Sequence, residues 1–502
     1  MAVYKILTEK GVPDAGQEAL LTELAAELGR PGAKVLLHLH GGLVAEAAGL
    51  AIADRLSGAV PNGWALGPEW TQVFVVWRTG AIESLRQDWE SVVTDDRLYQ
   101  TLLRRLLTFV ARKLAVPIAG GRGAGRSAIP DDNELLLRIT GQLEPERPLD
   151  QTGPEAQPEP GARAATFAGA SDNDLAGEFR DELEADDEFQ AALADIDAVV
   201  NARAEGRGPA VPAIASRGQA SFDNLSSEVR AELTAAAPDG VARRGPVSVA
   251  TFLLEHAAVI AFNCFQRFRT HRDHGLHATV VEELCRELYG DLVGVRIWGL
   301  MVKHAADHFA AGGYGNNLVD QLVRQPPVKM VVTAHSAGSI WASHLLLAMK
   351  AAEAMRPIDL YLLAPAVRQT LFATAVANAG ELVGSCRMLT MRDELERADA
   401  VLGKDKAFIY PSSLLYLVSG LFEEAGSKAY VDAPLLGMAR FVDAGWLTAA
   451  EAEANQTINA FFGRAGKGIV FSTEDDVTLA TSHGAFDSEA VTLATVRALF
   501  SA

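Results

Sequence analysis

Cysteine is rare in this 502-residue sequence, which contains only Cys264, Cys285 and Cys386. Their odd number and wide spacing exclude a disulfide-bonded scaffold and a cysteine-based zinc site. The sequence also lacks an unbroken apolar run of the roughly 20 residues that a membrane-spanning helix needs, since Glu255 and two other polar residues interrupt the nearest one, 247–265. No apolar core of a signal peptide follows the first methionine. These absences predict a cytoplasmic protein without a transmembrane segment.

Basic residues are few as well. The 45 Lys and Arg residues stand against 64 Asp and Glu residues, which gives a formal net charge of −19. A chain this acidic is repelled by nucleic acids and by anionic lipid surfaces, so we expect neither as a partner. Hydrophobic residues make up 49% of the sequence, which is enough for a sizeable core. The length suits two to three domains, or one domain with large insertions.

Short β-branched runs alternate with helical patterns in three parts of the chain. The strands predicted from these runs are 3–7, 34–39, 72–77, 328–333, 358–363, 386–391 and 468–471. Such alternation favours parallel βαβ units. We therefore predict an α/β fold, in which a mostly parallel sheet is flanked by helices and interrupted by one large and one smaller helical insertion.

The two insertions divide the predicted core into residues 1–80, 315–399 and 466–502. The larger insertion spans 81–314, and within it the stretch 141–245 is rich in proline and acidic residues, a composition that does not build a core. We expect this stretch to be a mobile acidic insert with one or two surface helices. Its acidic run 172–197 fits a solvated helix face, and a docking surface for a basic protein partner is the alternative. The second helical insertion is predicted at 400–465.

The segment 328–340 joins a strand pattern to a helical pattern through a turn of small residues, with Ser336 at the turn. This order is typical of a nucleophile elbow, in which a strained turn presents the serine Oγ and the following helix N-terminus offers backbone N–H groups. Ala334 and Gly338, two residues to either side, leave the space that such a turn requires. The alternative is an ordinary turn in which Ser336 caps the helix.

A glycine pair and a histidine are further candidates for chemistry. The predicted strand 34–39 ends in His40, Gly41 and Gly42, and glycines let backbone N–H groups approach an oxyanion. His483 follows the last predicted strand. Taken singly, these features also fit a glycine-rich turn without chemistry and a structural histidine.

An acid follows the predicted strand 386–391. Asp393 stands at the carboxyl end of this strand, where open α/β sheets place ligand-binding groups. Glu394, Glu396 and Asp399 are rival candidates. A solvated loop acid is the alternative interpretation of Asp393.

The motifs together resemble the α/β-hydrolase superfamily, of the lipase and esterase kind. The resemblance rests on Leu-His-Leu-His-Gly-Gly at 37–42, Thr-Ala-His-Ser-Ala-Gly-Ser at 333–339, Leu-Leu-Ala-Pro-Ala at 362–366 and His-Gly at 483–484. It implies Ser336 as the nucleophile, His483 as the base and Asp393 as the acid, in the chain order of that family's triad. The oxyanion hole would use the N–H groups of Ala337 and Gly42, with Leu43 as a further candidate.

The resemblance implies hydrolysis of a small-molecule carboxylic ester through an acyl-enzyme, without a metal or organic cofactor. The apolar helices predicted at 247–309 would then form a cap over the active site, with an apolar acyl groove as the alternative to a plain cap core. The same triad suits a thioesterase, an amidase or an acyltransferase, and a non-catalytic interaction protein on a hydrolase scaffold is the rival class. The sequence does not indicate an oligomeric state.

The remaining histidines of interest are expected to be structural. His38 should be buried and hydrogen-bonded, and His335 should pack against the elbow. His271, His274 and His277 are spaced by three residues, which favours a polar turn between two helices, and a metal site is the alternative.

Overall fold

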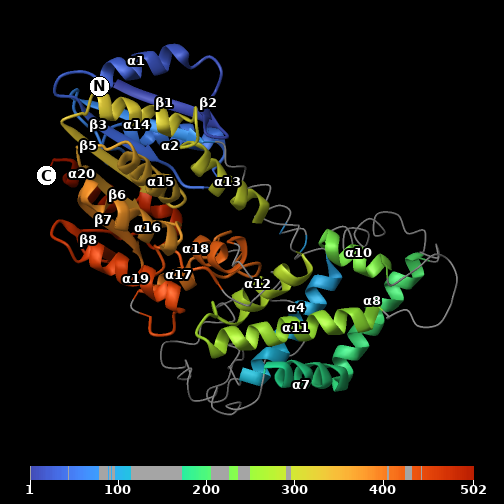
Figure 1. Ribbon diagram of the computed structural model, residues 1–502. Coiled ribbons are helices and arrows are strands. Elements are labelled where there is room, and N and C mark those ends of the chain that lie inside the picture. The colour runs from blue at the N-terminus through green and yellow to red at the C-terminus, as the bar shows by residue number, and fades with distance from the viewer. Residues whose placement is uncertain are drawn as a thin grey trace.

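The computed structural model describes residues 2–42, 44–77, 89, 92, 96–114, 172–204, 225–235, 249–289, 295–403, 406–423, 432–442 and 444–501. In this part of the chain, one sheet contains eight strands in the spatial order β2-β1-β4-β3-β5-β6-β7-β8 (Figure 1). The strands are β1 (Ala2–Glu9), β2 (Val12–Pro13), β3 (Lys34–Leu39), β4 (Trp70–Trp77), β5 (Lys329–His335), β6 (Ile358–Leu363), β7 (Val383–Met391) and β8 (Lys467–Ser472). All neighbours are parallel except β1 and β2. The predicted α/β class and all seven predicted strands are confirmed.

The strand order reverses beside β3. After β3 the chain moves outward to β4 on one side, whereas β5 pairs with β3 on the other side and β6, β7 and β8 continue away from it. At such a switch point the two flanking connections leave in opposite directions, which opens a crevice at the carboxyl ends of the central strands. The ends of β3 and β5 are therefore the part of the sheet where a ligand site is expected.

Helices cover both faces of the sheet. One face carries α2 (Glu46–Ser57) and α20 (Ala490–Ser501), whose Ala53, Leu56 and Phe500 share a core cluster with Leu36 of β3. The opposite face packs Val35 and other strand residues against a second set of helices. These are α1 (Glu18–Leu28), α13 (Val295–Asp307), α14 (Tyr314–Arg324), α15 (Gly338–Ala351), α16 (Gln369–Ala379) and α19 (Ala449–Phe462). The alternation along β3 is that of a strand buried on both faces.

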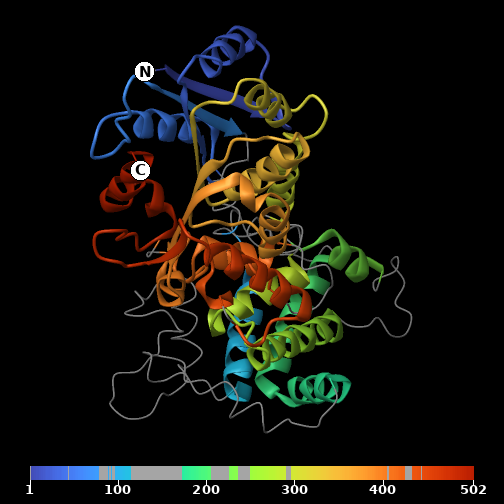
Figure 2. The same ribbon diagram turned by 60° about the vertical axis from the view of Figure 1, so that its left-hand side comes forward.

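A lobe of helices lies beside the sheet in both views (Figures 1 and 2). It contains α4 (Arg97–Leu114), α7 (Asp172–Ala185), α8 (Asp187–Ala204), α10 (Ser227–Ala235), α11 (Val249–Arg269) and α12 (Leu276–Leu288). The central helix α11 contacts α4, α7, α8 and α12. None of the described helices has the length and apolarity to cross a lipid bilayer.

The acidic run 172–197 forms α7 and α8, and its apolar residues are buried at the predicted helical spacing. Several of its carboxylates pair with basic side chains of α4: Glu178 and Glu182 lie on Lys113, and Glu188 lies on Arg105. Part of the negative charge is therefore neutralised inside the lobe. The stretches 141–171 and 205–224 lie outside the described residues.

The sequence predicts a helical insertion at 400–465, and its described part is less helical than that. Short elements make up most of it: α18 (Leu414–Leu417), the π-helical η4 (Val418–Phe422) and the 3-10 turn η5 (Ala439–Phe441). Only α19 is a full helix, and its start at Thr448 carries a capping box with Glu451. Helical spacing of apolar residues arises here from turns that bury side chains against the core, not from regular helix.

A buried network of charges connects the lobe to the 432–442 segment. Arg267 of α11 lies 2.6 Å from Glu282 and 3.0 Å from Glu283 of α12. Between the helices, the His274 ring is 2.8 Å from Glu282 through Nδ1 and 3.0 Å from Asp432 through Nε2. Both ring nitrogens face carboxylates, which only accept hydrogen bonds when ionised. These contacts fix the turn between α11 and α12 against the 432–442 segment.

Replacing Glu282 by glutamine is expected to lower the free energy of unfolding at pH 7 by roughly 1–3 kcal/mol, because Arg267 and His274 each lose one of their two buried carboxylate partners. Burial opposes ionisation of Glu282, but Arg267 and His274 outweigh it and lower its pKa from 4.5 to about 2. The stabilisation is thus complete above pH 4.5 and is lost as the pH falls towards 2. Urea unfolding between pH 3 and pH 7 measures both effects.

The matched control is Glu381→Gln, which removes the exposed partner of Lys350 and is expected to change stability little. A Glu282→Gln protein as stable as the wild type at pH 7, with the same loss of stability in acid, would contradict the assignment.

Candidate active site

Ser336 follows β5 at the switch point of the sheet and has a left-handed backbone, with φ at 51°. Its N–H donates to the carbonyl of Leu363 at 2.9 Å, and its own carbonyl accepts from the N–H of Ala366 at 3.0 Å. The end of β6 and the residues just after it therefore bind both the N–H and the carbonyl of Ser336. The side chain is 1% exposed, and its Oγ has no hydrogen-bond partner among the described residues.

The small residues around Ser336 let the following helix approach β3 closely. A Cβ at Gly338, the first residue of α15, would lie 2.5 Å from the backbone oxygen of Leu39 and 3.0 Å from that of His40. Both neighbours are backbone atoms, so only glycine fits. The close approach brings the N-terminus of α15, and with it the Ala337 N–H, to the carboxyl end of β3.

Gly41 and Gly42 lie directly beside the elbow. A Cβ at Gly41 would lie 3.3 Å from Cβ of Ser336, and one at Gly42 would lie 3.0 Å from Cβ of Ala337. The Gly42 position also faces the sulfur of Met301 on α13, too closely for a further methyl group. The structure thus brings together Ser336, Ala337 and Gly42 as the sequence predicts. Leu43, the further oxyanion candidate, lies outside the described residues.

His40 orients the peptide between Gly41 and Gly42. The N–H of Trp77 donates to its Nε2 at 3.3 Å, which puts the ring proton on Nδ1, and Nδ1 lies 2.6 Å from the carbonyl oxygen of Gly41. Burial lowers the pKa of His40 to about 4, so the neutral ring is the form present at pH 7. Since the carbonyl and N–H of one peptide point in opposite directions, a Gly41 carbonyl held by His40 turns the Gly42 N–H away from that ring.

His483 begins the short 3-10 helix η6 (His483–Asp487) and is 5% exposed. Its ring centroid is 5.2 Å from that of His335, the residue that precedes Ser336. Both ring nitrogens are buried and have no hydrogen-bond partner among the described residues. Burial lowers the pKa of His483 well below its usual range, and His335 lowers it further. His483 is therefore a neutral imidazole at pH 7 and has a free nitrogen to accept a proton.

The structure does not bring Asp393 to His483. Asp393 begins α17 (Asp393–Ala398), where one carboxylate oxygen accepts from the Tyr416 hydroxyl and the other accepts from Arg397 Nε at 2.9 Å. Burial opposes its ionisation, but Arg397 and Arg440 outweigh burial and hold the pKa of Asp393 below its ordinary value. Asp393 is thus a charged member of a local network on the side of α17 and α18.

Of the three rival acids, Asp399 contacts His483. Its Oδ2 accepts from the backbone N–H of His483 at 2.7 Å. Glu394 is exposed, and Glu396 is fully buried with a pKa that burial raises well above its usual range, so its carboxyl group is neutral. Asp399 is the C-cap residue of α17, so it lies at the opposite end of this short helix from Asp393 and within reach of η6.

The three spaced histidines have separate surroundings. His274 belongs to the charged network, His271 stacks on Trp446, and His277 is buried within α12 with a pKa that burial lowers to about 4. The predicted polar turn lies between Arg269 and Leu276, where α11 ends and α12 begins. No group of three or more His, Cys, Asp and Glu side chains in the described ranges is arranged to hold a metal ion. The predicted hydrogen bond of buried His38 is confirmed, with Thr333 Oγ1 at 2.9 Å.

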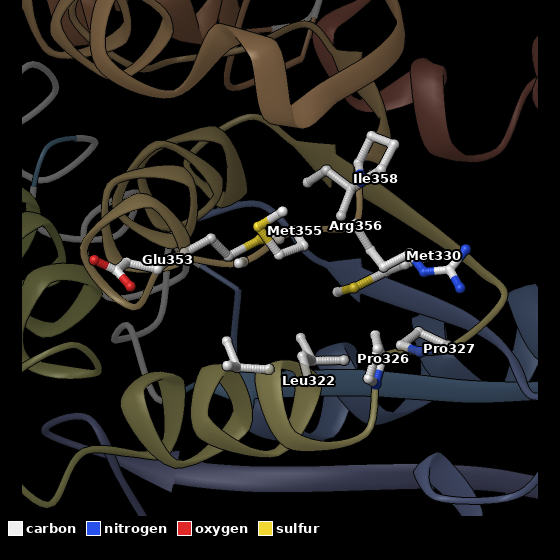
Figure 3. Close-up of a pocket in the computed structure, with 12 residues that line it drawn as sticks. Leu322, Pro326, Pro327, Met330, Glu353, Met355, Arg356 and Ile358 are labelled. Atoms are coloured by element: carbon white, nitrogen blue, oxygen red, sulfur yellow. The ribbon is translucent and has the colours of Figure 1, made fainter.

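A separate pocket of about 160 Å³ lies at the amino-terminal ends of β5 and β6 (Figure 3). Met330 and Ile358, which stand at the starts of β5 and β6, line it together with Met349 of α15 and the exposed Met355. Ser336 follows the other end of β5. This apolar pocket is therefore separate from the candidate site.

The sequence predicted one turn at Gly41 and Gly42 and another at Ser336, and the structure brings these two turns together. The sequence did not predict that His40 contacts the Gly41 carbonyl or that His335 contacts the His483 carbonyl. In the sequence, His40 and His335 each lie within two residues of a predicted site residue, and this position is the one available clue. What each ring contacts is visible only in the folded chain. Comparison with protein-family models, with curated proteins and with solved structures found no match for this chain.

Proposed function

We propose that this protein is a serine hydrolase that cleaves carboxylic esters through an acyl-enzyme on an α/β-hydrolase-like scaffold. The supporting observation is the state of Ser336: a non-glycine residue at φ 51°, at the switch point of the sheet, with a buried hydroxyl that has no partner in the described part of the chain. The left-handed backbone costs on the order of 1–3 kcal/mol, and the unpaired buried hydroxyl costs about as much. Such costs are concentrated at active sites, where the unpaired group meets a substrate.

In the proposed mechanism, Ser336 Oγ attacks the ester carbonyl carbon while His483 accepts the hydroxyl proton. The oxyanion of the tetrahedral intermediate accepts hydrogen bonds from the N–H groups of Ala337 and Gly42. His483 then gives the proton to the leaving alkoxide, and the acyl group stays on Ser336. Water attacks the acyl-enzyme with His483 as base again, which releases the carboxylic acid and restores the serine.

We assign the acid of the triad to Asp399 in place of Asp393. The imidazolium that forms on His483 is buried, so it needs a nearby negative charge. Asp399 contacts the His483 backbone, whereas both oxygens of Asp393 are occupied by Tyr416 and Arg397. The Asp399 carboxylate is held at the His483 backbone, so of the acids that follow β7 it is the one that the structure places in contact with this residue.

The surroundings of the site favour an apolar acyl group on the substrate. Met301 is 1% exposed and lies against Gly42, and Trp298 is buried on the same helix, α13. We assign the activity to the cytoplasm, because Cys264, Cys285 and Cys386 are all free thiols, as in a reducing compartment.

A fluorophosphonate probe tests the proposal, since it reacts covalently with activated serines. We expect labelling of the full-length wild type and none of Ser336→Ala or His483→Ala. The control is Ser385→Ala on β7, which removes a hydroxyl that donates to Asp359 of β6. This variant should be labelled like the wild type. A folded wild-type protein that neither reacts with the probe nor hydrolyses p-nitrophenyl acetate, butyrate or octanoate would overturn the proposal. Thioester and anilide analogues of the best ester then identify the preferred leaving group.

Replacing His40 by alanine is expected to lower kcat for the best p-nitrophenyl ester by about 10²–10³ with little change in KM, because the Gly41 carbonyl is released and the Gly42 N–H loses its orientation. His40→Asn keeps an N–H donor near the position of Nδ1 and should retain most of the activity. The matched control is His344→Gln on α15, a histidine that contacts Phe309. Equal kcat values for the alanine variant and the wild type would remove Gly42 from the oxyanion hole.

A further inference from the structure

We propose that His335 is a positioning residue that holds the base of the site, as part of a relay of contacts running from Arg55 through Asp487 to His483. This inference rests on the proposed function, since it assigns a role in aligning His483 with Ser336. It goes beyond the packing role that the sequence suggests for His335.

The first link is a direct contact between His335 and the backbone of His483. Nε2 of His335 lies 3.1 Å from the carbonyl oxygen of His483, and both residues are buried. A carbonyl oxygen only accepts, so Nε2 carries the ring proton and donates it. With this nitrogen occupied, His335 is not free to act as a base on the His483 side, and its contribution is to fix the His483 backbone.

The second link anchors Asp487, which lies beside the other edge of the His335 ring. Oδ2 of Asp487 is 3.8 Å from Nδ1 of His335, too far for a hydrogen bond. Arg55 of α2 in turn donates from Nη1 to the backbone oxygen of Asp487 at 2.5 Å and from Nη2 to Oδ1 at 3.1 Å. Arg55 thus anchors the last residue of η6 to the helix packed beneath it.

These contacts fix η6 at three points. Asp399 accepts from the N–H of His483, His335 donates to its carbonyl, and Arg55 holds Asp487. All three act on the backbone or on Asp487, and both nitrogens of the His483 ring have no partner in the described part of the chain. The base is therefore held in place without using the atoms that the reaction needs. Alignment within about half an ångström is what efficient proton transfer requires.

The position of His335 explains why this contact bears on the reaction. His335 and Ser336 are consecutive, and their side chains flank the same glycine: a Cβ at Gly41 would lie 3.2 Å from His335 Nδ1 and 3.3 Å from Ser336 Cβ. One strand end thus holds both the nucleophile and, through His335, the segment that carries the base. Any shift of β5 moves the two together, which preserves their separation.

Two substitutions at residue 335 test the proposal in the full-length protein, with p-nitrophenyl ester hydrolysis as the readout. His335→Leu keeps an apolar side chain but removes the donor, and we expect a loss of about 10²-fold in kcat with KM within twofold of the wild type. His335→Gln places an amide N–H near the position of Nε2, and we expect kcat within about fivefold of the wild type. Rescue by glutamine separates the hydrogen bond from simple packing.

Arg55→Gln should lower kcat by about tenfold, because Asp487 loses its charged anchor while the contact between His335 and His483 remains. The matched control is Arg324→Gln, which changes an exposed arginine at the end of α14. We expect this variant to have unchanged activity. The inference is overturned if His335→Leu is as active as the wild type, or if the glutamine variant falls as far as the leucine variant while both stay folded by circular dichroism. A wild-type protein that is inactive and unlabelled would refute the proposed hydrolase activity. An active wild type with an equally active His335→Leu variant would refute only the role of His335.

Discussion

Replacing Ser336 by alanine is expected to lower kcat for p-nitrophenyl ester hydrolysis on the order of 10⁶-fold, and His483→Ala should lower it about equally. The two side chains act in one step, because the hydroxyl is a poor nucleophile until the imidazole takes its proton. KM should change little, since neither side chain has to bind the ground state.

The double variant provides the sharper measurement. If Ser336 and His483 act as a unit, the variant that lacks both should be no slower than either single variant, within a few-fold. Residual rates above the uncatalysed reaction are expected in all three, because Gly42 and Ala337 are still present to stabilise the oxyanion. Losses that multiply in the double variant would mean that the two residues act independently, and a single loss under tenfold would exclude that residue from the chemical step.

Asp399→Asn is expected to lower kcat by about 10²-fold while leaving the fold intact, the size of effect that one nearby opposite charge has on an ionising group. The asparagine oxygen still accepts from the His483 N–H, so the backbone geometry is kept and only the negative charge beside the forming imidazolium is lost. Near-unchanged stability with a large kinetic loss is the expected signature of a charge that acts in the reaction.

Asp393→Asn is the paired experiment, with the opposite expected result. The substitution removes a buried charge from Arg397 and from the Tyr416 hydroxyl, so stability should fall, while turnover of the folded protein should stay within about fivefold of the wild type. Thermal unfolding and kcat measured on the same preparations separate the two roles. If instead Asp393→Asn shows the 10²-fold kinetic loss and Asp399→Asn does not, the acid is Asp393.

The strands were predictable because each is a short β-branched run between turn residues, and parallel strands buried on both faces keep that pattern whatever surrounds them. The tight turn at Ser336 was predictable for a similar reason. A sharp turn between a strand and a helix needs small neighbouring residues, and these are visible in the sequence. The sequence could not show which of Asp393 and Asp399 contacts His483, because both follow the same strand. The direction of α17 brings the Asp399 carboxylate to the His483 backbone and leaves Asp393 at the other end of the helix. The Asp393 and Arg397 spacing of four residues is the one local clue that Asp393 has a partner on its own helix.

Contacts across long separations escaped the sequence altogether. Arg55 reaches Asp487 over 432 residues, and Tyr410 reaches Glu282 over 128. Neither pair has a periodic pattern, because each depends on how segments from distant parts of the chain pack together in the folded protein. The described part of 400–442 shows the same limit, since its apolar residues pack in short turns and not in a long helix.

The insertion of the lobe between β4 and β5 has a consequence for how the molecule folds. Lys34 of β3 pairs with Lys329 of β5, and the paired strands are 295 residues apart in the chain. Closing so long a loop has an entropic cost that is met before the pairing stabilises anything, so this pairing is expected to be slow. Gly42 and Ser336 lie on opposite sides of that closure. We therefore expect Ser336 to be labelled by a fluorophosphonate only after the two halves of the sheet have joined, and a polypeptide in which the lobe alone has folded should not be labelled.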